Sequence, residues 1–207
     1  MKQPYYITSY CHIKNGAIYF NDHLIYKNEQ AFQIFIKGAY KHLEVNYPKF
    51  FKMDPLSKLA FIGAEVILEG KNKDSSLNQD IAILFSNRAS SLDTDRGYQE
   101  SISNKENYYP SPSVFVYTLP NICIGEICIK HKLLSENSFF IFESFNAEHL
   151  LVNAHSLLAS EKAEKVLCGW VDFDNEDYEA FLYLVEKEGN IEHQTKEINR
   201  LYNLWKN

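Results

Sequence analysis

The sequence predicts an α/β protein whose sheet is mostly parallel and mixed at one edge. Segments typical of strands alternate with segments typical of helices, as in layered α/β folds. The uninterrupted apolar run at 80–85 is typical of a strand buried on both faces of a parallel sheet. The last two predicted strands, 165–173 and 178–185, are joined by a short acidic turn, so they must form an antiparallel hairpin.

The N-terminal elements are a hairpin and an ambiguous stretch. Residues 5–13 are rich in Tyr, Ile and Thr, which favours a strand. Asn15 and Gly16 then predict a tight turn into a second strand. Residues 28–47 have apolar side chains at helical spacing, at Phe32, Phe35, Ile36 and Tyr40.

A helix is predicted to begin at Pro55, because proline suits the first helical position and Asp54 can cap it. Its apolar face continues to Glu69, and Gly70 is expected to end it. The other elements expected are a short polar helix within 90–103, a non-helical segment at 108–113, helices at 119–133 and 146–159, a strand at 138–142, and a closing amphipathic helix at 191–205.

Composition indicates a single domain, over residues 1–207, with a core of ordinary size. A net charge of −6 argues against nucleic-acid binding, which needs a basic surface. No apolar run reaches the ~18 residues of a membrane span, and the N-terminus lacks the apolar stretch of a signal peptide. A cytoplasmic protein is therefore expected.

No cofactor or metal is expected from the sequence. The four cysteines lie among apolar neighbours without a CxxC, which favours buried free thiols over a metal site or disulfides. There is no glycine-rich nucleotide motif. No metal-ligand spacing such as HExxH occurs at His12, His23, His42, His131 or His193.

Several segments resemble the N-terminal half of β-ketoacyl-ACP synthases. Residues 52–55 resemble that family's Met-Asp segment, and 87–95 resemble the loop after its second strand. Residues 111–115 and 119–127 resemble its Pro-Ser segment and Pro-Asn helix. The resemblance covers roughly residues 50–173, and it extends to short synthase-like proteins of bacterial polyene and flexirubin-type pigment clusters. It implies one half of the thiolase fold, with three layers, α/β/α, and a five-stranded mixed sheet.

The same resemblance implies that the family's nucleophilic cysteine is missing. If residues 161–164 align with the family's Gly-Asp-Ala-Asp turn, the cysteine position falls on Ser144. A serine forms a stable oxygen ester and is a poor substitute for a thiolate unless a base activates it. Phe145 and Asn146 also replace small residues, and the two histidines that support decarboxylation lie in the family's second half. We therefore expect a non-catalytic homologue in fatty-acid, polyene or pigment biosynthesis.

Two other functions stay open. Ser144 follows a strand and precedes a helix, so it is a candidate nucleophile of a small acyltransferase or hydrolase. His149 and His155 are its candidate bases, although a helix cap or turn is the more common role for such a serine. Alternatively, the chain is a binding protein for an acyl carrier protein or a lipid.

An interface is expected at residues 138–142. In the synthase family the corresponding strand pairs with its counterpart across a dimer axis, which implies a homodimer or a heterodimer with an active ketosynthase. A buried core strand is the alternative, but an exposed apolar edge would favour aggregation unless it were covered. A half-fold would also leave an apolar helix face to cover. The interface residues expected are Ser138, Phe139, Phe140, Ile141 and Phe142.

Docking of an acyl carrier protein would need a local basic patch, because carrier proteins are acidic and this chain is too. An ordinary solvated surface is the alternative explanation for these charges. The candidates are Lys49, Lys52, Lys58, Arg88 and Arg96.

Overall fold

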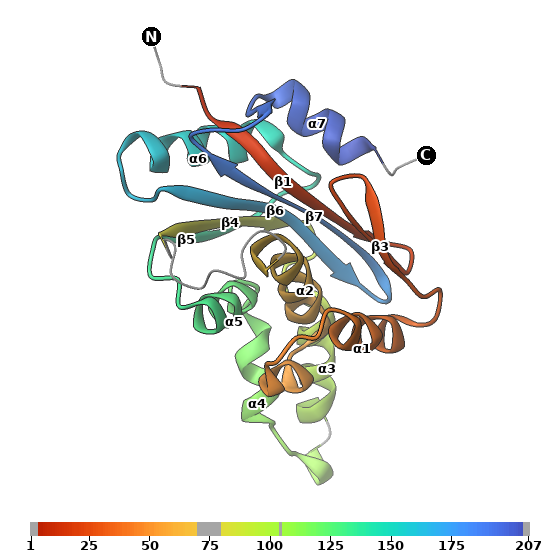
Figure 1. The fold of residues 1–207 in the computed structure, drawn as a ribbon. Coiled ribbons are helices and arrows are strands. Elements are labelled where there is room, and N and C mark those ends of the chain that lie inside the picture. Colours follow the sequence, from red (N-terminus) through yellow and green to blue (C-terminus); the bar gives the residue numbers. More distant parts are fainter. Residues whose placement is uncertain (1–3, 70–79, 104, 205–207) are drawn as a thin grey trace.

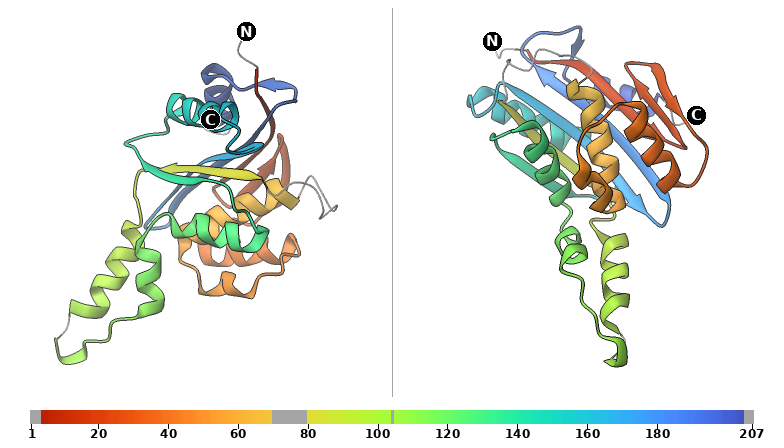
Figure 2. Two further views of the ribbon diagram at one scale, coloured as in Figure 1. Left: turned by 90° about the vertical axis from the view of Figure 1, so that its left-hand side faces the viewer. Right: turned by 60° about the horizontal axis from the view of Figure 1, so that its bottom comes forward.

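A computed structural model describes residues 4–69, 80–103 and 105–204. One mixed sheet lies between two layers of helices, which confirms the predicted α/β/α architecture (Figures 1 and 2). The sheet has eight strands rather than the five expected. The strands are β1 (Tyr6–Lys14), β2 (Ala17–Phe20), β3 (His23–Lys27), β4 (Ile81–Asn87), β5 (Asn137–Ile141), β6 (Lys165–Asp174), β7 (Asp177–Glu186) and β8 (Ile191–Glu192).

The strand order is β3-β2-β1-β7-β6-β4-β5, with β8 paired to β1. Strands β5, β4 and β6 are parallel, whereas β6 and β7 form the predicted antiparallel hairpin. Asn175 and Glu176 turn that hairpin with positive φ. The strands beyond the five-stranded sheet are β2, β3 and β8, of which β2 is the second strand predicted after the Asn15-Gly16 turn. Sequence reasoning missed β3 because it is a short edge strand whose side chains alternate poorly and stay largely exposed.

One helix layer consists of α1 (Phe32–His42), α2 (Pro55–Glu69) and α5 (Ile122–His131). Asp54 caps α2 as predicted, since its carboxylate accepts a hydrogen bond from the Ser57 amide at 3.0 Å. Gly63 lets α2 approach the sheet, because a Cβ there would lie 2.7 Å from Leu182 on β7. The expected helix end at Gly70 lies outside the described residues.

The other layer consists of α6 (Ala147–Ala159) and α7 (Thr195–Asn203). The helix expected over 191–205 is shorter, because Ile191 pairs with β1 as part of β8 before α7 begins. Residue 205 lies outside the described part of the chain. Buried apolar side chains form one cluster on each face of the sheet, so both helix layers are held by hydrophobic burial.

A helical arm, defined here as residues 92–103 and 105–119, projects from the body of the molecule (Figure 2). Among its described side chains only Thr94 and Tyr117 are buried. The segment predicted to be non-helical ends at Ser111, because Pro112 starts a short helix. The arm contains α3 (Leu92–Ser103), η2 (Lys105–Asn107), α4 (Pro112–Phe115) and η3 (Val116–Thr118); η1 (Pro48–Lys52) lies outside it.

Within the described residues, no single helix is both long enough and apolar enough to cross a membrane. Residues Pro112–Thr118 and Ile122–His131 meet the length and composition criteria only together, and a 101° bend separates them. Cys123, Ile124 and Ile127 on the second of these helices are fully buried inside the protein. Its apolar character is therefore explained by packing within the helix layer.

Candidate functional site around Ser144

Ser144 lies in the exposed turn between β5 and α6, two residues before the helix N-cap. The cap is Asn146, whose side-chain oxygen accepts a hydrogen bond from the His149 amide at 2.9 Å. The Ser144 hydroxyl therefore does not cap the helix. An oxyanion site at the first turn of α6 would also have to displace Asn146, because that side chain already holds one of the helix amides.

The candidate bases do not reach Ser144. The ring of His149 packs edge-on against Phe140 and Phe142, with centroid separations of 4.5 and 4.9 Å. The ring of His155 lies between Tyr5 and His193, with centroids 5.0 and 5.1 Å away. In the described structure, the Ser144 hydroxyl makes no hydrogen bond to a histidine or carboxylate. Nothing in this arrangement activates it as a nucleophile.

Phe145 fills the space next to Ser144. Its ring packs 4.1 Å from Tyr202 on α7, 5.7 Å from Phe181 on β7 and 6.2 Å from Trp170 on β6, measured between centroids. This aromatic cluster joins the β5–α6 turn to α7. The side chain after Ser144 is therefore held by aromatic packing between β6, β7 and α7.

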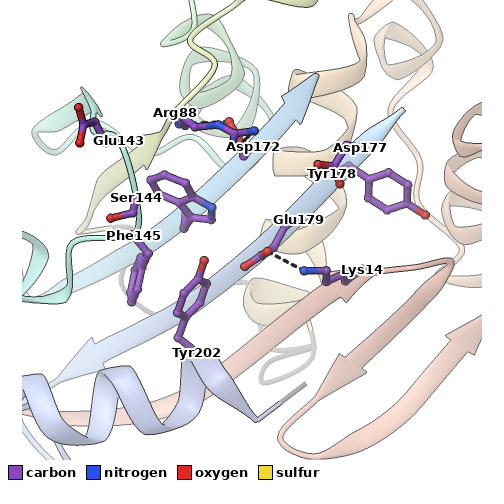
Figure 3. Close-up of a pocket in the computed structure, with 11 residues that line it drawn as sticks. Lys14, Arg88, Glu143, Ser144, Phe145, Asp172, Asp177, Tyr178, Glu179 and Tyr202 are labelled. Atoms are coloured by element: carbon purple, nitrogen blue, oxygen red, sulfur yellow. Dashed lines mark hydrogen bonds and ion pairs between the residues drawn. The ribbon is translucent and has the colours of Figure 1, made fainter. Parts of the chain in front are cut away.

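A cavity of about 230 Å³ opens beside this cluster, and it is lined by residues from both ends of the chain (Figure 3). Lys14 forms an ion pair with Glu179 at 2.9 Å. Arg88 forms one with Asp172 at 3.4 Å. The Ser144 hydroxyl points away from Asp172 and Glu179 (Figure 3). The cavity walls are polar, and two of the four lining carboxylates, Asp172 and Glu179, pair with cations.

Sequence reasoning named Arg88, Ser144 and Phe145 but missed the charged and aromatic residues of β1, β6, β7 and α7 that line this cavity with them. Strand register brings them together, since β1 and β7 pair Lys14 with Glu179, and β6 and β7 pair Asp172 with Glu179. The sequence feature that could have indicated the cavity is the group of charged residues at the strand ends of the predicted hairpin. Tyr202 on α7 also lines the cavity, and burial together with its hydrogen bond to Glu179 raises its pKa.

None of the four thiols replaces the missing cysteine. All four are free, as predicted; Cys11, Cys123 and Cys168 are buried, and Cys128 is half-buried. Burial raises the pKa of Cys168 to about 12 and also raises that of Cys128. These thiols stay protonated at neutral pH, so they lack the thiolate that acyl transfer needs.

Of the five candidate carrier-docking residues, three pair with carboxylates and a fourth is buried. Lys49 forms an ion pair with Glu126 at 2.8 Å. Arg96 pairs with Asp174, and Arg88 with Asp172. Lys58 is only 6% exposed, and its burial lowers its pKa.

Lys52, on η1, lines a second cavity of about 290 Å³ at the base of the arm. Because these five residues do not form one group of exposed charges, carrier docking stays a prediction.

The strand predicted as an interface is an edge strand. In the described sheet, β5 pairs only with β4, so its other edge has no strand beside it. Phe139 packs toward the α2–α5 side and Phe140 toward the α6 side. Ile141 is 49% exposed, and the Phe142 amide donates to the Asn87 carbonyl at 2.9 Å. A free edge flanked by apolar side chains is the geometry needed for strand pairing between chains.

The sequence matches no protein-family model and no curated protein. The fold matches solved ketosynthase structures. One is the ketosynthase ApeO in complex with its chain length factor ApeC from Xenorhabdus doucetiae. It superposes with a TM-score of 0.60 at 14% identity, over 97% of this chain and 90% of the matched chain.

In two other matches, the solved chain is longer than this one. The ishigamide ketosynthase/chain length factor has a TM-score of 0.60 at 15% identity, over 88% of this chain and 62% of that chain. The AntDE:AntF complex, a type II PKS acyl-carrier protein with its ketosynthase, has a TM-score of 0.63 at 12% identity. The match covers 96% of this chain and 65% of that chain. This chain thus spans less than two thirds of both. Its fold is that of the ketosynthases and chain length factors, as the sequence resemblance implied.

Proposed function

We propose that this chain is a non-catalytic, synthase-like subunit that pairs with an active ketosynthase in fatty-acid, polyene or pigment biosynthesis. What supports the proposal is a ketosynthase-like fold in which Ser144, which the sequence resemblance aligns with the nucleophile, is exposed and unactivated and is followed by a packed phenylalanine. The reaction would then take place at the partner's cysteine. Two of the matched structures contain a ketosynthase and a chain length factor, which supports a paired arrangement.

The β5 edge is the pairing surface we propose. Exposed apolar side chains occur on every element that borders it: Ile129 on α5, Leu134 before β5, Ile141 on β5 and Val152 on α6. Leu134 is 95% exposed, which is unusual for a residue leading into an apolar strand. A partner strand added to β5 would satisfy its outer backbone groups and cover these side chains.

The arm provides a second apolar surface for the same partner. Tyr109 is 79% exposed, Tyr108 61%, and Phe115 and Leu119 both 56%. Aromatic side chains are enriched at protein interfaces, and monomeric proteins rarely leave so many of them uncovered. The arm fits the expectation that a half-fold leaves an apolar helix face for a partner to cover.

A serine-dependent acyltransferase is the weaker proposal, because neither His149 nor His155 reaches Ser144. The free thiols agree with a subunit that works in the reducing cytoplasm. An acyl carrier protein would dock on the assembled pair, where the partner supplies the reacting group. In that arrangement the basic residues of this chain need not form a complete docking site alone.

Co-expression of this chain with an active ketosynthase from the same organism tests the proposal. We expect one stable mixed complex, recognised by its mass in solution. Ile141→Lys should disrupt it, because a charge would enter the pairing edge. Leu24→Lys is the matched control, since Leu24 is 51% exposed on β3, the opposite edge strand.

Loss of the complex in the Ile141 variant alone would support pairing through β5. A chain whose mass does not change when the synthase is present would contradict the proposal. Equal loss in both variants would contradict the role of β5 in particular.

A further inference from the structure

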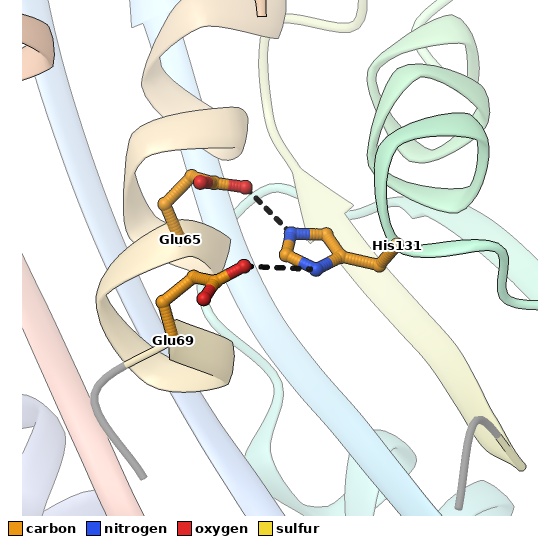
Figure 4. Close-up of side chains that lie close together, drawn as sticks. All are labelled: Glu65, Glu69 and His131. Atoms are coloured by element: carbon orange, nitrogen blue, oxygen red, sulfur yellow. Dashed lines mark hydrogen bonds and ion pairs between the residues drawn. The ribbon is translucent and has the colours of Figure 1, made fainter. Parts of the chain in front are cut away.

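Three ligand-type side chains meet in the α2–α5 helix layer, away from Ser144 (Figure 4). Glu65 and Glu69 lie one turn apart on α2, and His131 lies at the end of α5. The His131 Nε2 atom is 2.6 Å from Glu65 Oε1, and Nδ1 is 3.9 Å from Glu69 Oε1. One potential ligand atom from each residue lies within 4.8 Å of the others.

The burial of this cluster makes its charge balance important. The side chain of Glu65 is 4% exposed and that of His131 is 11% exposed, whereas Glu69 is 55% exposed. A buried carboxylate is costly unless a positive charge or hydrogen bonds compensate it. Lys130 lies 3.8 Å from Glu69, on the exposed side of the cluster. Glu65 is compensated by its close contact with the His131 ring at 2.6 Å, and a bound cation between the two would compensate it more strongly.

We propose that Glu65, Glu69 and His131 bind a divalent transition-metal cation of the zinc class. The donor set of one imidazole nitrogen and two carboxylate oxygens suits Zn²⁺, whereas Mg²⁺ and Ca²⁺ prefer oxygen ligands alone. Three protein ligands would leave a fourth position for water. The cation would displace the proton that Nε2 shares with Glu65, and that proton would pass to solvent.

The geometry requires only a small adjustment. Two ligands at ~2.0 Å from a tetrahedral zinc are roughly 3.3 Å apart. The present Nε2–Oε1 separation is 2.6 Å, so the two side chains need to move apart by less than an ångström. Glu69 is the more exposed ligand, and its carboxylate, now 3.9 Å from Nδ1, would have to turn toward the Nε2 side to reach the ion. The bound cation would connect the C-terminal ends of α2 and α5.

This site escaped sequence reasoning because its ligands do not form a short motif. Glu65 and Glu69 have the one-turn spacing of a helix, but such carboxylate pairs are common on helix surfaces without a metal. His131 is far away in the sequence and comes near only because α5 packs against α2. The proposal does not depend on the pairing role of the chain.

Zinc titration of the full chain, prepared without a histidine tag and stripped with a chelator, tests the site. Isothermal calorimetry should show one Zn²⁺ per chain, and the melting temperature should rise with zinc because the ion binds the folded state. Mg²⁺ at the same concentration should produce neither effect. Loss of a ligand should weaken zinc binding at least ~10-fold, the lower end of the effect of losing a supporting residue.

The variants are His131→Ala and Glu69→Gln, with His23→Ala as the control. His23 is an exposed histidine on β3, so its loss should leave zinc binding unchanged. Glu69 is half exposed, so its variant should fold even if the loss of His131 disturbs the helix layer. The proposal would be overturned if the chain did not bind zinc, or if both ligand variants still bound it. It would also be overturned if Mg²⁺ bound equally well.

Discussion

Phe145, the residue after Ser144, packs its ring 4.1 Å from that of Tyr202 on the last helix. This contact connects the β5–α6 turn to the C-terminal part of the chain. The side of Ser144 that faces Phe145 is filled by this aromatic packing, so an acyl chain cannot enter there without breaking it.

Phe145→Ala should therefore destabilise the protein without creating activity. We expect a loss of about 2 kcal/mol in the free energy of unfolding, below the ~3–5 kcal/mol of a fully buried phenylalanine because Phe145 is half-buried. Urea denaturation followed by tryptophan fluorescence measures it. Phe115→Ala, at a 56% exposed position on the arm, should change the stability by much less. Equal losses of stability in the two variants would show that the aromatic cluster stabilises the fold no more than an exposed side chain does.

Ser144→Cys should not restore condensation. The new thiol would be exposed and without a base, and Asn146 already occupies the amide of His149 at the helix start. Incubation with acyl and malonyl carrier proteins, followed by intact-mass analysis, should show no acyl-enzyme and no condensed product. A stable acyl adduct with turnover would mean that the site is catalytically competent and that only the sulfur was missing.

Tyr117→Phe should destabilise the base of the arm. Its hydroxyl donates to the buried carboxylate of Glu126 at 3.1 Å, which also accepts from the Tyr47 hydroxyl at 3.0 Å and pairs with Lys49. Removing one donor to a buried charge should cost about 1–2 kcal/mol. Chemical denaturation compares it with Tyr109→Phe, whose hydroxyl is exposed and whose loss should be neutral. A neutral Tyr117 variant would refute the proposed network.

His193 should make the fold sensitive to mild acid. Burial, with a smaller contribution from His155, lowers the pKa of His193 to about 3. Below the ordinary pKa of 6.5 the unfolded chain binds a proton that the folded chain does not, so stability falls as the pH falls, by about 1.4 kcal/mol per pH unit. From pH 7.5 to 5 this contributes about 2 kcal/mol.

His193→Phe should remove that part of the pH dependence. Neither ring nitrogen of His193 has a hydrogen-bond partner in the described structure, so an aromatic replacement forfeits no side-chain hydrogen bond. The ring lies near His155 and Tyr183, with centroids 5.1 and 5.6 Å away. Unfolding measured at pH 5 and 7.5 compares the two proteins. If both proteins lost the same stability between pH 7.5 and 5, the acid sensitivity would belong to other groups.

Most of the fold could be predicted because its main elements have strong local signals. The apolar run in β4, the cap and proline of α2, and the Asn15-Gly16 turn each specify structure through nearby residues. β3 and β8 could not be predicted in this way. Each is held by its pairing with a neighbouring strand. The sequence pattern of β3 is too weak to predict a strand, and that of β8 predicted a helix.

The site was less predictable than the fold. The sequence indicated Ser144 and the strand beside it, but only the tertiary structure shows that His149 turns toward Phe140 and that Phe145 turns toward Tyr202. Contacts between residues far apart in the chain decide these orientations. The cluster of Glu65, Glu69 and His131 depends in the same way on the packing of α5 against α2.

Amide hydrogen exchange of the chain, alone and mixed with the ketosynthase proposed as its partner, tests the central claim most directly. We predict slower exchange at 137–141 and at residues 108–119 of the arm when the synthase is present. We predict no change at 23–27, the opposite edge of the sheet. Protection at 23–27 without protection at 137–141, or no difference between the two samples, would contradict pairing through β5.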